Sequence, residues 1–274
     1  MKTKRFSPLF FASVGVRIFV GCSMVLCMSL CGLPQVSADE NSAKLKPILA
    51  IPGRVVLEEG FSDAGMEVSK DVWLTRQGTR WAVEDGVLQG RESSAEFQAA
   101  RKHHFGYEPR LSIPVTPQEF VAEFSFRFID GEETAIVPFV EFGHHVCRIR
   151  FSREGASLIA DHESLKLDES TDFVWQSGKW YHALAEMKDG QFVMQIAGGP
   201  TLAASHPSFR QPPSSGGNGI GFAGPKHGRV ELDNIKIATA EDIRPDWKAA
   251  AARLGTFVPV RIKEPKPATK KKGE

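Results

Sequence analysis

The stretch of sequence that decides the fold is Gln118-Glu-Phe-Val-Ala-Glu-Phe-Ser-Phe-Arg-Phe128. From Phe120 to Phe128 every second residue is apolar, and the residues between them include Glu123, Ser125 and Arg127. This period of two is typical of a β-strand whose one face is buried and whose other face is polar. The stretch therefore predicts a strand with its phenylalanines in the core.

Short apolar or alternating runs continue on both sides of this strand. We predict further strands at residues 55–59, 81–84, 87–89, 135–142, 145–151, 156–161, 180–188, 192–197, 219–223 and 229–237. Asp85-Gly86 and Asp189-Gly190 are strong two-residue hairpin signals, and Asp130-Gly131 marks another turn. No helical pattern of ordinary length interrupts the series, which disfavours a parallel sheet with crossover helices. Residues 54–239 are therefore predicted to form an all-β sandwich or jelly roll of two antiparallel sheets.

The last strand and the segment after it carry two more signals. Val230 and Leu232 are in one phase of the alternation and Ile235 and Ile237 are in the other, which predicts a bulge at Asp233-Asn234. Residues 240–255 are predicted to hold a short helix, from Pro245 at a first helical position to Leu254 just before a glycine. One face of this helix is expected to pack on the outside of the sandwich, through Trp247, Ala250, Ala251 and Leu254.

The first 38 residues predict export. They hold four basic residues and no acid, an apolar run at residues 18–33 and a small-residue cleavage site at Val36-Ser37-Ala38, which is the pattern of a signal peptide. The alternatives are an uncleaved anchor and a lipoprotein modified at Cys22. We expect a secreted, periplasmic or cell-envelope protein with no membrane span after cleavage. Nucleic acid is then a poor expectation as a partner.

Three of the four cysteines lie in this leader, at positions 22, 27 and 31. After cleavage only Cys147 remains, so we expect no intramolecular disulfide and no metal site built on paired cysteines. Cys147 is in phase with apolar residues of its strand, which predicts a buried thiol.

The formal net charge of +1 conceals an uneven distribution. The leader carries four positive charges, residues 39–255 carry a net −7, and the segment from residue 256 carries a net +4. We expect a linker at 39–53 and a disordered Lys- and Pro-rich tail at 256–274. The tail is either a solvated terminus or a contact for anionic polymers of the envelope.

Several segments together resemble a known superfamily. They are Gly60-Phe-Ser-Asp63, Trp81-Ala-Val-Glu-Asp-Gly-Val-Leu-Gln-Gly90, Lys179-Trp-Tyr-His182, Gly219-Ile-Gly-Phe222 and Val230-Glu-Leu-Asp-Asn-Ile235. Their order is similar to that of concanavalin A-like lectin/glucanase domains, in particular the laminin-G-like group that includes the 3-keto-disaccharide hydrolase domain of secreted bacterial proteins. The resemblance implies a jelly-roll sandwich whose concave sheet faces a saccharide. It also implies that Ca²⁺ is conceivable as a bound ion; no other cofactor is expected.

The sequence departs from the catalytic patterns of that superfamily. Glucanases carry Glu-x-Asp-x-Glu or Glu-x-Asp-x-x-Glu on one strand, and the nearest match here is Glu231-Leu-Asp233, followed by Ile235 and Lys236 where the second glutamate would stand. A retaining glycosidase needs two carboxyl groups about 5–5.5 Å apart. The Asn-Ser-Gly-type strand of the hydrolase domain is replaced by Phe139-Val-Glu-Phe-Gly-His-His-Val-Cys147. Glucanase chemistry is therefore not expected.

Charged side chains occupy the polar faces of the central strands and are the predicted ligand-binding residues. If these strands are neighbours in one concave sheet, their arginines can make bidentate contacts to sugar hydroxyls or to a carboxylated sugar. The alternative is a ladder of cross-strand ion pairs on a solvated face. Trp175, in a polar loop, is a candidate for stacking on a sugar ring, and core packing is its alternative. The set is Glu123, Arg127, Arg148, Arg150 and Trp175, together with Glu141.

Catalytic and metal-binding residues are less clearly indicated. Glu141 and His182 are the candidates for acid–base chemistry, and His182 shares a strand face with Glu186. His144-His145-x-Cys147 suggests a metal ligand set, but neighbouring strand residues point to opposite faces, so no metal site is predicted. The chain has no Gly-x-Ser-x-Gly elbow, phosphate loop or dinucleotide fingerprint.

Three functions remain open at this point. The first is a secreted carbohydrate-binding sandwich without glucanase chemistry. The second is a hydrolase or lyase acting on 3-keto-disaccharides or related disaccharides. The third is an envelope scaffold or interaction protein.

Overall fold

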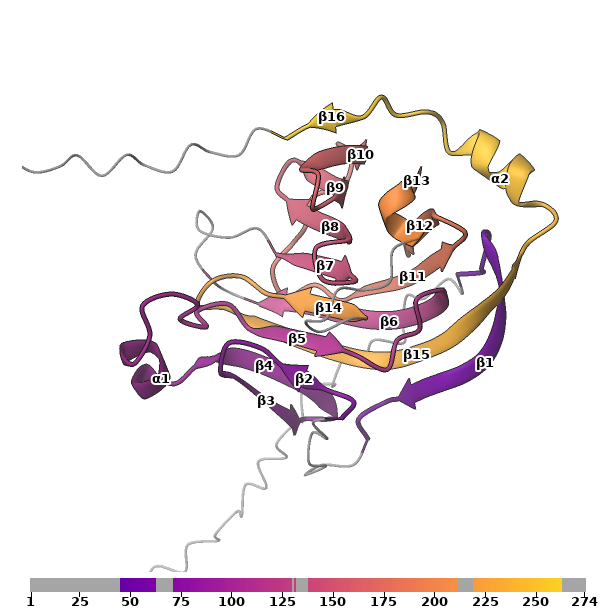
Figure 1. Cartoon of the computed structure of the whole chain (residues 1–274). Coiled ribbons are helices and arrows are strands. Elements are labelled where there is room, and N and C mark those ends of the chain that lie inside the picture. Colours follow the sequence, from indigo (N-terminus) through magenta and orange to yellow (C-terminus); the bar gives the residue numbers. More distant parts are fainter. Residues whose placement is uncertain (1–44, 63–70, 130, 132–137, 211–218, 263–274) are drawn as a thin grey trace, which may run out of the picture. The chain divides into compact units, whose positions relative to one another are not determined.

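The computed structural model describes residues 45–62, 71–129, 131, 138–210 and 219–262 (Figure 1). The predicted leader with its three cysteines, Asp130 of the Asp130-Gly131 turn and the basic residues 263–274 lie outside these ranges. Among the described residues, no helix is long and apolar enough to cross a membrane.

Two eight-stranded sheets form the fold, and every strand pair in them is antiparallel. Sheet A has the order β13 (Thr201–Ser205), β12 (Gln191–Ile196), β11 (Tyr181–Lys188), β6 (Phe120–Ile129), β15 (Arg229–Ile243), β4 (Val87–Ser93) and β3 (Thr79–Glu84), with β1 (Ala50–Glu59) beside β15. Sheet B has the order β16 (Val260–Arg261), β10 (Leu165–Ser170), β9 (Gly155–Ala160), β8 (Cys147–Ser152), β7 (Phe139–Phe142), β14 (Ile220–Ala223), β5 (Arg110–Ile113) and β2 (Leu74–Thr75). The predicted all-β jelly-roll sandwich of two antiparallel sheets is confirmed.

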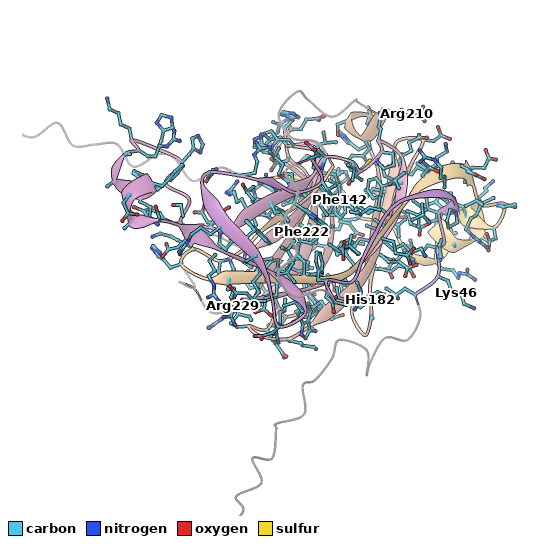
Figure 2. All side chains as sticks on the ribbon, turned by 90° about the horizontal axis from the view of Figure 1, so that it is seen from below. Lys46, Phe142, His182, Arg210, Phe222 and Arg229 are labelled. Atoms are coloured by element: carbon cyan, nitrogen blue, oxygen red, sulfur yellow. The ribbon has the colours of Figure 1, made fainter. Side chains whose placement is uncertain are left out.

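The core lies between the two sheets and is rich in phenylalanine. The apolar face of β6, from Phe120 to Phe128, is at most 3% exposed, as its alternation predicts. Phe124 of sheet A meets Phe222 of sheet B edge-on, with ring centroids 5.4 Å apart. In Figure 2, Phe142 and Phe222 lie inside the sandwich. Cys147 is fully buried in this core, where burial raises the pKa of its thiol well above the ordinary value and keeps it protonated.

Turn chemistry and the predicted bulge are confirmed. Asp85-Gly86 and Asp189-Gly190 have positive φ at both positions, as a tight hairpin turn requires. The pairing of β15 with β6 shifts between Asp233 and Lys236, and Asn234 has a φ of 49°. This shift keeps the apolar residues on both sides of the bulge in the core, and none of them is more than 1% exposed: Val230, Leu232, Ile235 and Ile237.

The element boundaries differ from the predicted ones at both ends. β1 begins at Ala50, inside the predicted linker, and β16 lies inside the predicted tail and pairs with β10. Residues 240–243 extend β15, so the helix α2 runs only over Trp247–Arg253. β5, β10 and β13 were not predicted; in β10 a register shift between Lys166 and Asp168 interrupts the alternation that would reveal a strand. Two short helices, α1 (Ala95–Ala99) and the 3₁₀ turn η2 (Pro207–Arg210), complete the fold.

A second apolar layer covers part of the outer face of sheet A. The helix α2 and the segment before β1 pack there on side chains of β6, β11 and β12, as predicted for α2. The carboxylate of Glu186, 0% exposed, accepts backbone N–H groups of Ile48, Leu49 and Ala50 at 2.9, 3.0 and 2.8 Å. Part of this outer face is therefore closed by the chain itself.

Candidate functional site

The six predicted polar-face and loop residues do not share one sheet. Glu123 and Arg127 lie on β6 in sheet A, whereas Glu141 lies on β7 and Arg148 and Arg150 on β8, in sheet B. Since the two sheets pack through their inner faces, the two groups point outward on opposite sides of the sandwich. The prediction of one shared concave face for all of them is wrong.

The group on sheet A is a structural ion-pair network. Glu231 is 1% exposed; its carboxylate contacts Arg127 Nε and lies 2.9 Å from Arg229 Nε. The guanidinium of Arg127 stacks 4.7 Å above the Trp180 ring. Glu231, from the segment nearest to the glucanase motif, is thus enclosed between two arginines, and Arg127 is held by its neighbours.

His182 and Glu186 do not form an acid–base pair. His182 Nδ1 lies 3.3 Å from Ser125 Oγ, and the two oxygens of Glu186 accept the backbone N–H groups before β1. In Figure 2, His182 lies at the side of the sandwich, as does Arg229. His182 is on sheet A and Glu141 on sheet B, so the two predicted catalytic candidates face opposite sides and cannot act on one substrate.

Trp175 packs against the core instead of presenting a stacking face. Its ring centroid lies 5.9 Å from that of Phe128, and the side chain is half-buried against the main cluster. Its Nε1 atom is buried and has no hydrogen-bond partner among the described residues. The core-packing alternative therefore holds for Trp175.

The outer face of sheet B carries a connected polar group, which we call the Arg148 cluster: Glu141, His145, Arg148, Arg150 and Asp161. Arg148 Nη2 lies 3.2 Å from Glu141 Oε2 and 3.1 Å from Asp161 Oδ2. His145 Nδ1 lies 2.6 Å from the same Asp161 oxygen, and Arg150 Nη2 lies 3.7 Å from Asp161 Oδ1. One guanidinium thus joins two carboxylates, one from β7 and one from the turn after β9.

An aromatic ring lies at the base of this cluster. The guanidinium carbon of Arg148 lies 4.0 Å from the centre of the Phe139 ring, and that of Arg110 lies 5.5 Å from it. Arg148 is 8% exposed, and its Nε atom is buried without a hydrogen-bond partner in the described part of the chain. The stack on Phe139 holds the guanidinium plane in place.

Local sequence features position the cluster. β7 and β8 form a hairpin in which Glu141 pairs directly with Arg148, and the turn between them has positive φ at Gly143 and His145. On the neighbouring strand Gly221 faces Glu141, and a Cβ at that glycine would lie 2.7 Å from Glu141 Cγ. The absence of a side chain at position 221 therefore leaves room for the Glu141 side chain over β14, and Arg148 contacts its carboxylate from β8, on the other side of β7.

Both carboxylates of the cluster contact positive or protonatable groups. Burial alone raises the pKa of Glu141, but the nearby His144 and the charge of Arg148 outweigh it, so its pKa lies below the ordinary value of 4.5. The ionised form is therefore stabilised by folding. Its contribution is fully present above pH 4.5 and is lost as the pH falls through the lower folded-state pKa.

This linkage gives a first prediction. Lowering the pH from 5.5 to below 4.5 is expected to destabilise the wild-type protein more than Glu141→Gln, because the glutamine has no carboxylate to protonate. Urea unfolding at a series of pH values measures how the free energy of unfolding of each protein depends on pH. If the free energy of unfolding depends on pH in the same way in both proteins, the neighbours of Glu141 do not stabilise its ionised form, and the prediction is wrong.

The two histidines before Cys147 contact different carboxylates. His144 and His145 lie in the turn, with ring centroids 4.0 Å apart; His144 Nδ1 lies 3.7 Å from Glu141, and His145 contacts Asp161. Cys147 points into the core. Within the described ranges no three His, Cys, Asp or Glu side chains are grouped so as to hold a metal ion.

Three residues around Arg148 could not be identified as part of a site from the sequence. Asp161 follows the last residue of β9 and was assigned only to a strand, although Ser157, Ile159 and Asp161 alternate outward. Phe139 lies in a predicted strand and alternates outward with Glu141, whereas Arg110 belongs to β5, which the sequence did not reveal. The outward alternation was therefore the available signal for Asp161 and Phe139.

The sequence matches no family model and, at a significant level, no curated protein. Solved structures with a related arrangement include a protein of unknown function with a galectin-like fold from Bacillus subtilis, at 13% identity and a TM-score of 0.47, which covers 70% of this chain and 98% of its own. The Ca²⁺- and mannose-bound exoplasmic/lumenal domain of VIP36 has 10% identity and a TM-score of 0.48, with coverages of 70% and 94%. A β-1,3-glucanase from Mycobacterium marinum has 10% identity and a TM-score of 0.44, with coverages of 68% and 99%.

Proposed function

We propose that this protein binds a saccharide, without hydrolysing it, on the outer face of sheet B. The observation that carries the proposal is the Arg148 cluster: a guanidinium fixed over an aromatic ring and in contact with two carboxylates. We further propose that the protein acts after export, as its leader predicts.

The accessibility of the two outer faces supports this choice. On sheet A, α2 and residues 45–50 cover part of the face, and the ion pairs around buried Glu231 occupy another part. On sheet B, the described contacts to elements of sheet A include those of β9 and β10 with β13 and of β2 with β3. A ligand that approaches the sandwich therefore meets polar side chains on sheet B.

The chemistry of the cluster suits a polyhydroxylated ligand. A guanidinium presents several N–H donors in one plane, and carboxylates accept hydrogen bonds from hydroxyl groups. Neighbouring hydroxyls of a sugar are both donors and acceptors, so they can bind to Arg148, Glu141 and Asp161 together. Because these side chains already hold one another in place, little conformational entropy is lost on binding.

Binding fits this geometry better than hydrolysis does. Glu141 and Asp161 both contact the Nη2 atom of Arg148, and a glycosidase also uses a pair of carboxyl groups. Such a pair, however, needs one carboxylic acid with a raised pKa, and the pKa of Glu141 is lowered. The resemblance to 3-keto-disaccharide hydrolase domains remains the basis of the enzyme alternative, which release of a monosaccharide from a keto-disaccharide would support.

A steric block tests the proposal. A glycan array first identifies a saccharide that binds, and Ser157→Trp then places a large ring on the outer face of β9, next to Arg150 in the strand register. We expect this variant to lose binding to that saccharide at least tenfold in calorimetry. Ala82→Trp adds the same ring to an exposed position of sheet A and is expected to bind normally.

Two outcomes would overturn the proposal. One is an array on which the folded protein binds no saccharide at all. The other is a saccharide whose affinity falls equally, or not at all, in the two tryptophan variants, because the ligand would then lie elsewhere.

A further inference from the structure

A pocket lies at an edge of the sandwich, away from the Arg148 cluster. The chain leaves sheet A at the end of β15, forms α2 and joins sheet B as β16, and so it crosses from one sheet to the other (Figure 1). Beneath this crossing is a pocket of about 410 Å³, within the size range of small-molecule sites. Its walls come from β10, β12, β13, α2 and the segment after α2.

One part of the pocket wall is apolar and partly aromatic. Trp247 and Ala251 come from α2, Leu254 ends it, and Phe257 comes from the segment that follows. Trp247 is fixed because its Nε1 donates to Gln191 Oε1 at 2.5 Å. This wall offers rings and methyl groups to the body of a ligand.

The opposite wall carries two carboxylates. Asp168 Oδ2 accepts the Ala203 N–H at 2.8 Å, which links β10 to β13, and Asp168 Oδ1 accepts the Glu169 N–H at 2.8 Å. The neighbouring Glu169 is paired with Lys166 Nζ at 2.7 Å. Within the described residues Asp168 belongs to no ion pair, and the residues that line the pocket include no lysine, arginine or histidine.

Asp168 is the pocket residue whose ionised carboxylate a bound cation would stabilise. Burial raises its pKa above the ordinary value of 3.8, only partly offset by the two backbone N–H groups, and the charge of Glu169 adds to the rise. A positive group placed in the pocket would relieve this cost by pairing with the ionised carboxylate.

We propose that this pocket binds a small organic cation, with a primary amine directed at Asp168 and an apolar or aromatic body against Trp247, Leu254 and Phe257. The site is separate from the saccharide face, and its existence does not depend on the proposed function.

Titration of the full chain with phenethylamine tests this site. We expect saturable binding, measured by calorimetry and by the amide chemical shifts of residues 247–257. The neutral 2-phenylethanol should bind at least tenfold more weakly. Asp168→Asn should weaken phenethylamine at least tenfold. Ala251→Trp, which fills the pocket from α2 without a change in charge, should abolish binding. Glu163→Gln removes a half-exposed carboxylate beside His206, outside the pocket, and should bind like wild type.

Several results would overturn the proposal. They are the absence of saturable binding at millimolar phenethylamine, equal affinity for phenylethanol, and binding that both pocket variants leave unchanged. If Asp168→Asn lowers the melting temperature, because its carboxylate also links two strands, Ala251→Trp still decides whether the pocket is the site.

Discussion

Replacing Glu186 with alanine is expected to lower the free energy of unfolding by about 3–5 kcal/mol. The carboxylate is fully buried and accepts three consecutive backbone N–H groups, from Ile48 to Ala50. Without it these donors lose their partner in a site closed to water, and each unsatisfied donor costs about 1–3 kcal/mol. Urea unfolding measures the change, and hydrogen exchange at Leu49 and Ala50 should accelerate.

Glu123→Ala is the matched control for this prediction. Glu123 lies on the same outer face, opposite Leu184 in the strand register, but it is half-exposed and accepts no backbone N–H among the described residues. Its loss should change the free energy of unfolding by about 0.5 kcal/mol at most. If Glu186→Ala were no more destabilising than Glu123→Ala, residues 45–50 would not be fastened over sheet A, and the argument that this face is closed would fail.

Replacing Arg148 with lysine is expected to weaken saccharide binding by about 10- to 100-fold, which corresponds to about 1.4–2.8 kcal/mol. A lysine keeps the positive charge but has no planar fork, so it cannot stack on Phe139 while it contacts Glu141 and Asp161 together. Calorimetry with the saccharide selected on the array measures the loss.

Arg127→Lys provides the comparison for Arg148→Lys. Arg127 also contacts a carboxylate and stacks on an aromatic ring, but it lies on sheet A. This variant should bind the saccharide like wild type. A full loss of affinity in Arg127→Lys, with Arg148→Lys unaffected, would move the site to the opposite face.

The fold was largely accessible from the sequence because alternation reports directly which side chains face the core. The five-residue apolar face of β6 and the phase change around Asn234 are local patterns, and both are confirmed in the structure. β10 and β13 were missed for a physical reason: a register shift interrupts the first, and the second is a short strand at the edge of sheet A.

The residues of the candidate site could be predicted only in part from the sequence, because alternation does not show to which sheet a strand belongs. Glu141 and Arg148 are hairpin neighbours and do face each other, but β6 pairs with β11 and β15, which removes Glu123 and Arg127 from them. The role of Glu186 was equally hidden, since a glutamate on a strand face gives no sign that a distant segment will cover it.

Chemical-shift mapping with the selected saccharide tests the central claim most directly. We expect the amide signals of residues 139–142 and 147–161 to move when the saccharide is added. In Arg148→Lys the same signals should move only at higher saccharide concentrations. Shifts confined to residues 120–129, 181–188 and 229–236 would place the ligand on sheet A and contradict the assignment of the binding face.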